Sequence, residues 1–248
     1  MKDYFKLGKI GAKAHWKQVN GPIHEHIRKN HKTLKKEKAR LVGFIMGDGC
    51  ISVLGNIPTR QHHDICFYPD HESMVELFIE DFKKLYLKSP HIRNLGKYYA
   101  VRVSSKPACD DLRSFGDFSS LKWKAPIFSS KGESIEWLKA MFDCEAHISK
   151  KDIRIQSVSK NGIDSVKQLL HSFGIDSKAY TYNRKNPNWN TNHILVISRR
   201  ENIKRYQNLI GFNHKNKHLK LNLLAGVPER LMGQSRKLVS ARTSRFES

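Results

Sequence analysis

The sequence predicts an α+β fold made of two pseudo-twofold αββαββα repeats, each with a four-stranded antiparallel sheet. Three observations predict it: an internal duplication, the same order of helical and strand patterns in both copies, and a composition that supports a hydrophobic core. The chain has 248 residues, of which 39% are hydrophobic and 10% aromatic, as is typical of globular proteins. A chain of this length buries enough apolar surface for one large domain or two smaller ones.

The duplication is clearest in two nonapeptides that open the copies. They are Leu41–Gly49, with the sequence LVGFIMGDG, and Leu138–Ala146, with the sequence LKAMFDCEA. Small residues stand at the third and seventh places of both segments, and a carboxylate stands at the eighth. Helix-favouring sequence precedes each segment, with Thr33 and Ser134 as the expected N-caps. Both segments are therefore predicted to be helices that carry a carboxylate near the C-terminal end.

The remaining elements recur in the same order in both copies. Each opening helix is followed by a hairpin, a helix, a second hairpin and a last helix, as judged from the period of the apolar residues. The expected alternating strands are 64–68 and 154–158, the middle helices 72–87 and 162–173, the final strands 101–104 and 194–198, and the last helices 108–115 and 201–210. Alternation of apolar and polar residues is expected where a sheet buries one face against helices.

The charge balance points to a polyanionic partner. Lysine and arginine number 45 against 23 aspartate and glutamate residues, which gives a formal net charge of +22. Such a surplus is typical of proteins that bind nucleic acid. No segment combines a basic face with a broad apolar face, as a membrane-surface helix does. We therefore expect a nucleic acid as the partner and no membrane.

Features of a secreted or membrane protein are missing from the sequence. The longest apolar run, 41–46, is too short to span a bilayer, and the segment 1–4 does not begin an apolar signal-peptide core. The four cysteines show no CxxC pair and no spacing typical of a metal site; they are Cys50, Cys66, Cys109 and Cys144. We expect reduced thiols in an intracellular protein of the cytoplasm, nucleoid or an organelle.

Basic segments flank the repeats. Residues 1–36 are expected to form a basic N-terminal extension, which is either a poorly ordered tail or an arm that follows DNA. Residues 225–248 are expected to form a basic C-terminal tail. The repeats themselves are assigned to 37–124 and 125–224.

The carboxylates of the two opening helices predict a metal site. Small residues four apart lie on one helix face and let two helices approach closely; they are Gly43 and Gly47 in the first copy, and Ala140 and Cys144 in the second. If these faces pack together, Asp48 and Glu145 meet at the same end. Two close carboxylates repel each other unless a cation lies between them, and oxygen ligands favour Mg²⁺. This favours metal-assisted phosphodiester hydrolysis. The alternative is that both carboxylates are ordinary C-terminal helix residues.

These nonapeptides resemble a known signature. Leu41–Gly49 resembles the LAGLIDADG motif of homing endonucleases, and Leu138–Ala146 resembles its second copy in the single-chain members. The surrounding segments Phe67–Asp70, Ile155–Ser159 and Ile210–Phe212 are similar to the same family. The resemblance covers roughly residues 37 to 224.

The resemblance implies a site-specific endonuclease that cuts both strands of DNA and acts as a monomer. Its two sheets would form a saddle over the major groove of double-stranded DNA. Asp48 and Glu145 would be the catalytic residues and would each bind Mg²⁺ or Mn²⁺, with the backbone carbonyls of Gly47 and Cys144 as further ligands. Cleavage would leave short 3′ overhangs. Lys160 is the basic residue at the strand end where many members carry an accessory glutamine or lysine.

Strand alternation predicts which side chains face the DNA groove. With Ile65 and Phe67 in the core, Asp64 and Cys66 should be exposed, and the same reasoning applies to the other strands. Arginine recognises guanine and glutamine recognises adenine in a bidentate manner. The residues expected to contact DNA, including those at the hairpin tips, are Arg60, Gln61, His62, Tyr98, Arg102, Arg154, Gln156, Lys160, Arg184, Lys185, Asn188 and Asn190.

Two other functions fit the same pattern. One is an RNA maturase that binds intron RNA on the same fold, which the charge suits equally well. The other is a catalytically inactive regulator that binds DNA, and the presence of both Asp48 and Glu145 speaks against it.

Overall fold

The computed structural model describes residues 18, 20–30, 33–55, 61–183, 186 and 188–226. Residues 20–30 are helical. The first repeat then comprises α2 (Lys35–Asp48), β1 (Gly49–Leu54), β2 (His62–Phe67), α3 (Glu72–Tyr86), β3 (His91–Asn94), β4 (Tyr99–Ser104) and α4 (Lys106–Arg113). The second comprises α5 (Lys131–Glu145), β5 (His147–Ile148), β6 (Ile153–Ser157), α6 (Lys160–Ser172), β7 (Lys178–Tyr182), β8 (Asn192–Ile197) and α7 (Arg200–Leu209), followed by α8 (Lys215–Leu224).

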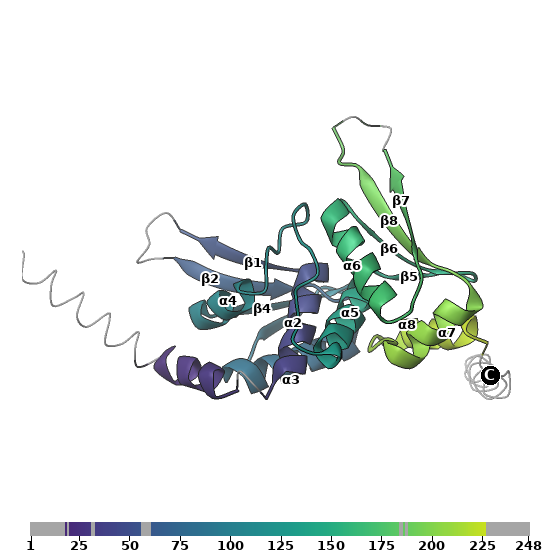
Figure 1. Ribbon diagram of the computed structural model, residues 1–248. Helices are drawn as coiled ribbons and strands as arrows, with labels where there is room; N and C mark the ends of the chain where they lie inside the picture. The colour runs from purple at the N-terminus through teal and green to yellow at the C-terminus, as the bar shows by residue number, and fades with distance from the viewer. Residues whose placement is uncertain are drawn as a thin grey trace, which may run out of the picture.

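The predicted repeat architecture is confirmed. The strands form two four-stranded antiparallel sheets with the same order, β1-β2-β4-β3 and β5-β6-β8-β7. Figure 1 shows α2 and α5 side by side in the middle of the molecule, with one sheet on either side of them. The helix α8 is an addition to the second repeat that has no counterpart in the predicted pattern.

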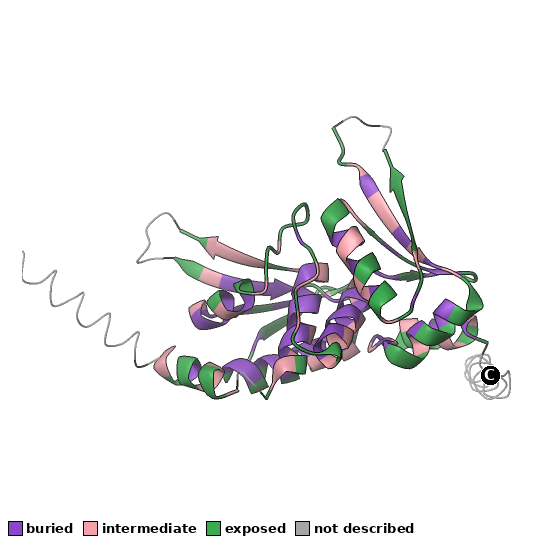
Figure 2. Cartoon of the chain, viewed as in Figure 1, coloured by how far each residue is buried: buried purple, intermediate pink, exposed green. Residues whose placement is uncertain are grey.

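The inward residues of the central strands form the core that was expected of them. Ile65 and Phe67 on β2 and Ile153 and Ile155 on β6 are buried. Phe67 packs against Phe44 of α2, with 5.0 Å between the ring centroids. Figure 2 shows buried residues concentrated in α2, α5 and the adjoining strands. The sheets are therefore fixed to the central helix pair by their apolar faces.

The small residues of α2 and α5 meet as predicted. A Cβ atom placed on Gly43 would lie 2.8 Å from the Cβ of Ala140 and 2.6 Å from the carbonyl oxygen of Trp137. A Cβ atom on Gly47 would lie 2.5 Å from the Cβ of Cys144. Glycine on α2 thus makes room for the larger small residues of α5. This close approach brings the C-terminal ends of the two helices together.

A salt-bridge network also joins the two repeats. Arg40 of α2 donates from Nε to Asp81 of α3 at 2.6 Å and from Nη1 to Glu136 of α5 at 2.5 Å. Asp81 is fully buried, so its charge depends on this arginine.

The expected helix caps are wrong at both positions. The N-cap of α2 is Leu34, without a side-chain hydrogen bond, and Thr33 instead donates to the carbonyl oxygen of Asn30. The N-cap of α5 is Ser130, whose hydroxyl accepts from the backbone N–H of Glu133 at 3.3 Å. The Ser130 hydroxyl also donates to the Glu133 carboxylate at 2.8 Å, so the cap lies four residues earlier than the predicted cap at Ser134.

Replacing Gly43 with alanine is expected to destabilise the protein by about 1–3 kcal/mol, because the added methyl group overpacks the helix contact. Thermal or urea unfolding measures this loss. Gly21→Ala is the matched control, because a Cβ there meets nothing within 4 Å; it should be neutral or stabilise the helix by up to about 1 kcal/mol. Equal stability of the Gly43→Ala variant and the parent protein would contradict the close contact.

The four cysteines are free thiols. In the part of the chain that the structure describes, every helix is too short or too polar to cross a bilayer.

Candidate active site between the repeats

Asp48 and Glu145 occupy equivalent positions at the junction of the repeats. Asp48 is the last residue of α2 and Glu145 the last residue of α5, and a strand begins shortly after each. The backbone N–H of Tyr68 donates to the carbonyl oxygen of Asp48 at 2.8 Å, which ties the end of α2 to β2. Both side chains are partly buried.

The two carboxylates interact electrostatically. Burial, together with the negative charge of Asp48, raises the pKa of Glu145 to about 7. Burial also raises the pKa of Asp48, and the charge of Asp70 acts in the same direction. The ammonium group of Lys217 opposes both pKa shifts. Burial and mutual repulsion disfavour the ionised forms of the two carboxylates, and a cation bound beside them would favour those forms.

Lys217 is the functional candidate that the sequence did not reveal. It lies in the first turn of α8, and its Nζ donates to the carbonyl oxygens of Asp143 at 2.5 Å and Cys144 at 2.9 Å. Its positive charge therefore lies beside the C-terminal end of α5 and acts on Asp48 and Glu145. The sequence offers only a weak indication of this role, because Lys217 is one of several lysines that follow the segment Ile210–Phe212.

Asp143 fixes the loop that delivers Lys217. Its carboxylate accepts from the backbone N–H groups of Asn213 and His214 and from the Asn213 side chain, all at 2.9 Å. Burial raises the pKa of Asp143 to about 6 despite these donors. His214 caps α8 by accepting from the N–H of Lys217 at 3.4 Å. The loop, the cap and the lysine are thus held by the residue two positions before Glu145.

The same loop also contacts the first repeat. The Nε2 atom of buried His214 lies 3.2 Å from Oδ1 of Asp70, which follows β2. The ring of His214 lies 4.6 Å from the ring of His71, measured between centroids. Both repeats therefore contribute to the position of Lys217.

The donors at this junction fit a divalent cation. Carboxylate and carbonyl oxygens are the ligands that Mg²⁺ prefers, and Mg²⁺ commonly binds one or two protein carboxylates together with substrate phosphates and water. Among the residues that the structure describes, no group of three or more His, Cys, Asp and Glu side chains is arranged to hold a metal ion. Any cation here thus depends on Asp48, Glu145, backbone carbonyls and oxygens from outside the protein. The carbonyl oxygen of Cys144 already accepts from Lys217 and has one lone pair left.

Nine of the expected DNA-contacting residues lie within the described part of the chain, and all of them are exposed. They are Gln61, His62, Tyr98, Arg102, Arg154, Gln156, Lys160, Asn188 and Asn190. The other three, Arg60, Arg184 and Lys185, lie outside the described residues. The exposed set comes from both sheets and both long hairpins, on either side of the carboxylates.

Several of these side chains already have partners. Arg102 pairs with Asp64, and Arg154 pairs with Asp152 through two hydrogen bonds of 2.7 and 2.8 Å. Lys160 pairs with Asp164 at 2.7 Å. Among the described residues, Lys217 is the basic group whose charge lowers the pKa of both Asp48 and Glu145.

The expected exposure of Asp64 and Cys66 is wrong. Their relative exposures are only 1% and 9%, although both lie on the face opposite Ile65 and Phe67. Arg102 and Ser104 of the neighbouring strand β4 hydrogen-bond to Asp64 and cover it. Strand alternation predicts the correct face of the sheet for Asp64 and Cys66, but it does not predict that side chains of the neighbouring strand cover that face.

Comparison with known proteins identifies the domain type. Residues 133–211, within the second repeat, match the family described as LAGLIDADG-like domain. The homing endonuclease I-DmoI in complex with DNA and Mn is similar in structure, with a TM-score of 0.58 and 21% identity over 72% of this chain and 97% of that chain. The homing endonuclease I-WcaI bound to its DNA recognition sequence has a TM-score of 0.51 and 15% identity over 81% of this chain and 91% of that chain.

Similar segments also occur in larger proteins. A glutamine–fructose-6-phosphate aminotransferase (isomerizing) of Methanocaldococcus jannaschii is 27% identical over 202 residues, which is 78% of this chain and 18% of the relative. A replication factor C small subunit of Thermococcus kodakarensis is 28% identical over 182 residues, which is 72% of this chain and 20% of the relative. The chain therefore spans a fifth or less of the length of these relatives.

The structural similarities show the fold, and the match to the second repeat shows the domain type. Both repeats adopt the same architecture around paired signature helices. Residues 133–211 thus match the LAGLIDADG-like domain, and the chain as a whole has the fold of the homing endonucleases I-DmoI and I-WcaI.

Proposed function

We propose that the chain is a site-specific endonuclease, of the homing endonuclease type, that hydrolyses both strands of double-stranded DNA with a divalent metal. The observation that carries this is the pair Asp48 and Glu145, one from each repeat, at the adjoining ends of α2 and α5. Each lies near the other's charge, and the pKa of Glu145 is raised to about 7. One chain supplies both carboxylates, so a monomer suffices.

The roles of the residues follow from their positions. A bound divalent cation supplies charge stabilisation for the phosphate and lowers the pKa of water. Asp48 and Glu145 would each bind a divalent cation, and each residue would serve the cleavage of one DNA strand. The carbonyls of Gly47 and Cys144 would be additional ligands. Lys217 donates to the carbonyl oxygens of Asp143 and Cys144, and its positive charge would stabilise the negative charge that develops on the phosphate during hydrolysis. Because Lys217 lies on the second repeat, the two strands are expected to be cut at unequal rates.

The choice of cofactor and partner is supported by the neighbours. Structures of I-DmoI contain DNA with Mn and DNA with Ca. For this chain we propose Mg²⁺ or Mn²⁺ as the cofactor and double-stranded DNA as the substrate. The donors at Asp48 and Glu145 are all oxygens, which agrees with these ions.

The names of the larger relatives do not define the activity. An aminotransferase and a replication factor subunit share this segment over a fifth of their length or less. Those named activities differ from each other, so the shared segment is better explained as a module with a function of its own.

Binding to DNA is expected to depend strongly on salt. With a net charge of +22, several lysine and arginine side chains should displace counterions from phosphates, and log affinity should fall with log salt with a slope of magnitude at least about 5. Fluorescence anisotropy with a labelled duplex from 50 to 300 mM KCl gives the slope. A slope near zero would contradict nucleic-acid binding.

Cleavage of a plasmid library separates the candidate functions. The protein is incubated with randomised sites and Mg²⁺, and the new ends are sequenced. An endonuclease yields ends clustered at one long sequence. Binding of intron RNA without DNA cleavage would favour the maturase, and specific DNA binding without cleavage would favour the regulator.

A further inference from the structure

We propose that the cavity on the exposed face of the first sheet, between Arg93 and Arg102, reads a guanine of the target DNA, with Asp64 as the residue that positions Arg102. This role rests on the proposed function, because it assigns a preferred base to one half of the target site.

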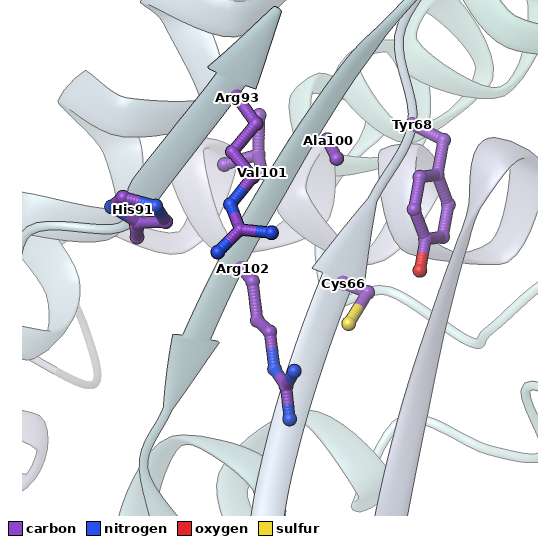
Figure 3. A pocket seen from close by; sticks show the side chains of 7 residues that line it. All are labelled: Cys66, Tyr68, His91, Arg93, Ala100, Val101 and Arg102. Carbon is purple, nitrogen blue, oxygen red and sulfur yellow. The ribbon is translucent and has the colours of Figure 1, made fainter. Parts of the chain in front are cut away.

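The cavity brings two guanidinium groups to one face of the sheet. It has a volume of about 320 Å³ and is lined by residues of β2, β3 and β4. His91 stands opposite Arg102 and Arg93 opposite Ala100, so these four side chains share a face. Figure 3 shows the side chains of Arg93 and Arg102 extending along the strands on the same side, with both guanidinium groups at the cavity. The site thus offers many hydrogen-bond donors to a ligand rich in acceptors.

Asp64 holds Arg102 in place. The Nη2 atom of Arg102 donates to Asp64 Oδ2 at 2.5 Å, and the hydroxyl of Ser104 donates to the other carboxylate oxygen. Asp64 has a relative exposure of 1%, whereas the side chain of Arg102 is 59% exposed. The carboxylate is therefore fixed on the sheet while the guanidinium points into solvent with its other donors available to a ligand. The Arg102 guanidinium keeps the pKa of Asp64 below its usual value despite burial.

The carboxylate distinguishes a base from a phosphate as the ligand. A negative charge beside Arg102 weakens its attraction to phosphate, so a carboxylate is a disadvantage if the arginine only supplies charge. It is an advantage if the arginine must keep one orientation, because bidentate recognition of guanine O6 and N7 depends on the angle of the guanidinium. Fixing that angle before binding lowers the entropic cost of recognition.

The second sheet presents a different surface. Arg154 is also held by an aspartate, Asp152, but its partners in the strand register are His147 and Val196. In the second sheet Lys178 pairs with Val196 as His91 pairs with Arg102 in the first, so the positions equivalent to Arg93 and Arg102 are held by Tyr180 and Val196. We therefore expect the guanine preference in the half of the target site that the first repeat contacts.

Arg102 pairs with His91, and Arg93 lies two residues further along β3. The two arginines are therefore separated by roughly 7 Å along the strand direction. The rise per base pair along one strand is about 3.4 Å. We therefore expect the two arginines to act on base pairs no more than about two steps apart.

Binding-site selection in Ca²⁺ tests the role, because it measures base preference without cleavage. The full chain and its variants are selected against a randomised duplex library, and the preference at each position is compared. Arg93→Ala and Arg102→Ala should each reduce a guanine preference by roughly 5- to 150-fold at neighbouring positions, which corresponds to the usual range for a bidentate contact. Arg154→Ala should change the other half of the site instead.

Substitutions of Asp64 are expected to change base preference without weakening the affinity for DNA. Asp64→Ala should reduce the guanine preference at the Arg102 position alone, while affinity for random DNA stays the same or rises because a negative charge is lost. Asp64→Asn keeps an oxygen acceptor for Arg102 and should retain part of the preference, and it also serves if the alanine variant does not fold. Asp110→Ala is the matched control, since it removes one carboxylate from the exposed Lys106–Asp110 pair; it should leave base preference unchanged.

Two outcomes would overturn the assignment. Uniform weakening across all sequences by Arg93→Ala and Arg102→Ala would make them phosphate contacts. Loss of preference at every position in Asp64→Asn would make Asp64 a purely structural residue. A parent protein that shows no sequence preference at all would instead contradict the proposed site-specific function.

Discussion

Asp48→Asn and Glu145→Gln are each expected to lower the rate of double-strand cleavage by roughly 10²–10³, the usual effect of losing a charge-stabilising group. Each substitution removes a negative charge but nearly preserves the shape of the side chain. Affinity for DNA should not fall, and it should rise slightly in the absence of metal, because a carboxylate near phosphates repels them. Nicking and linearisation of a supercoiled plasmid measure the rates.

The single variants need not behave alike. Lys217 contacts the end of α5 and leaves the end of α2 without an equivalent contact among the described residues. One single variant should therefore keep slow nicking of one strand, and the double variant should be inactive. A gel-shift assay in Ca²⁺ is the control for DNA binding.

Two results would contradict this role of the carboxylates. Linearisation at the parental rate by either variant would show that Asp48 and Glu145 are not the metal ligands. Loss of DNA binding by both variants would favour the alternative in which they only support the helix ends.

Lys217→Met is expected to slow cleavage by roughly 10²-fold at neutral pH. The variant loses the ammonium group beside the carbonyls of Asp143 and Cys144. Lys217 also lowers the pKa of Glu145, which burial and Asp48 raise to about 7. Without Lys217 that pKa moves further up, so Glu145 ionises only at higher pH. The activity of the variant should therefore rise over a more alkaline range than that of the parent.

Rates of plasmid nicking from pH 6 to 9 test this shift. Lys215→Met is the matched control, because it removes the same charge from an exposed position in the same helix turn. It should lower DNA affinity slightly and leave the pH profile unchanged. Identical pH profiles and rates for Lys217→Met and the parent would exclude Lys217 from the site.

The helix pair could be predicted because its determinants are local. Gly43 and Gly47 lie on one face by helix geometry alone, and their i, i+4 spacing is repeated at Ala140 and Cys144. Close packing then requires Asp48 and Glu145 to meet. The fold class, the order of the elements and the inward residues of the strands follow from the same short-range patterns.

Lys217 could not be predicted because its position depends on distant contacts. The start of α8 is held at the end of α5 by the hydrogen bonds of Asp143 with Asn213 and His214. Nothing in the local pattern marks Asp143 as the residue that fixes this loop. The sequence favours Lys160 as the basic residue of the site because it follows a predicted strand. In the structure Lys160 forms a salt bridge with Asp164, one helical turn further along.

The exposure of single side chains was also beyond the local pattern. Alternation placed Asp64 on the exposed face, but a carboxylate beside an arginine and a serine on the neighbouring strand becomes covered by both. The cap of α5 is also misplaced by the local pattern, since Ser130 caps the helix and bonds to Glu133, whereas Ser134 lies within the helix.

The most direct test of the proposed nuclease is to map the ends made by the parent and by the Asp48→Asn, Glu145→Gln double variant on one selected target site in Mg²⁺. We predict that the parent cuts both strands at a single place, leaves short 3′ overhangs and needs the metal, whereas the double variant binds the site and leaves it intact. Equal cleavage by the two proteins, or specific binding by the parent with no cleavage in Mg²⁺ or Mn²⁺, would contradict the assignment of Asp48 and Glu145 to a metal-dependent DNA endonuclease.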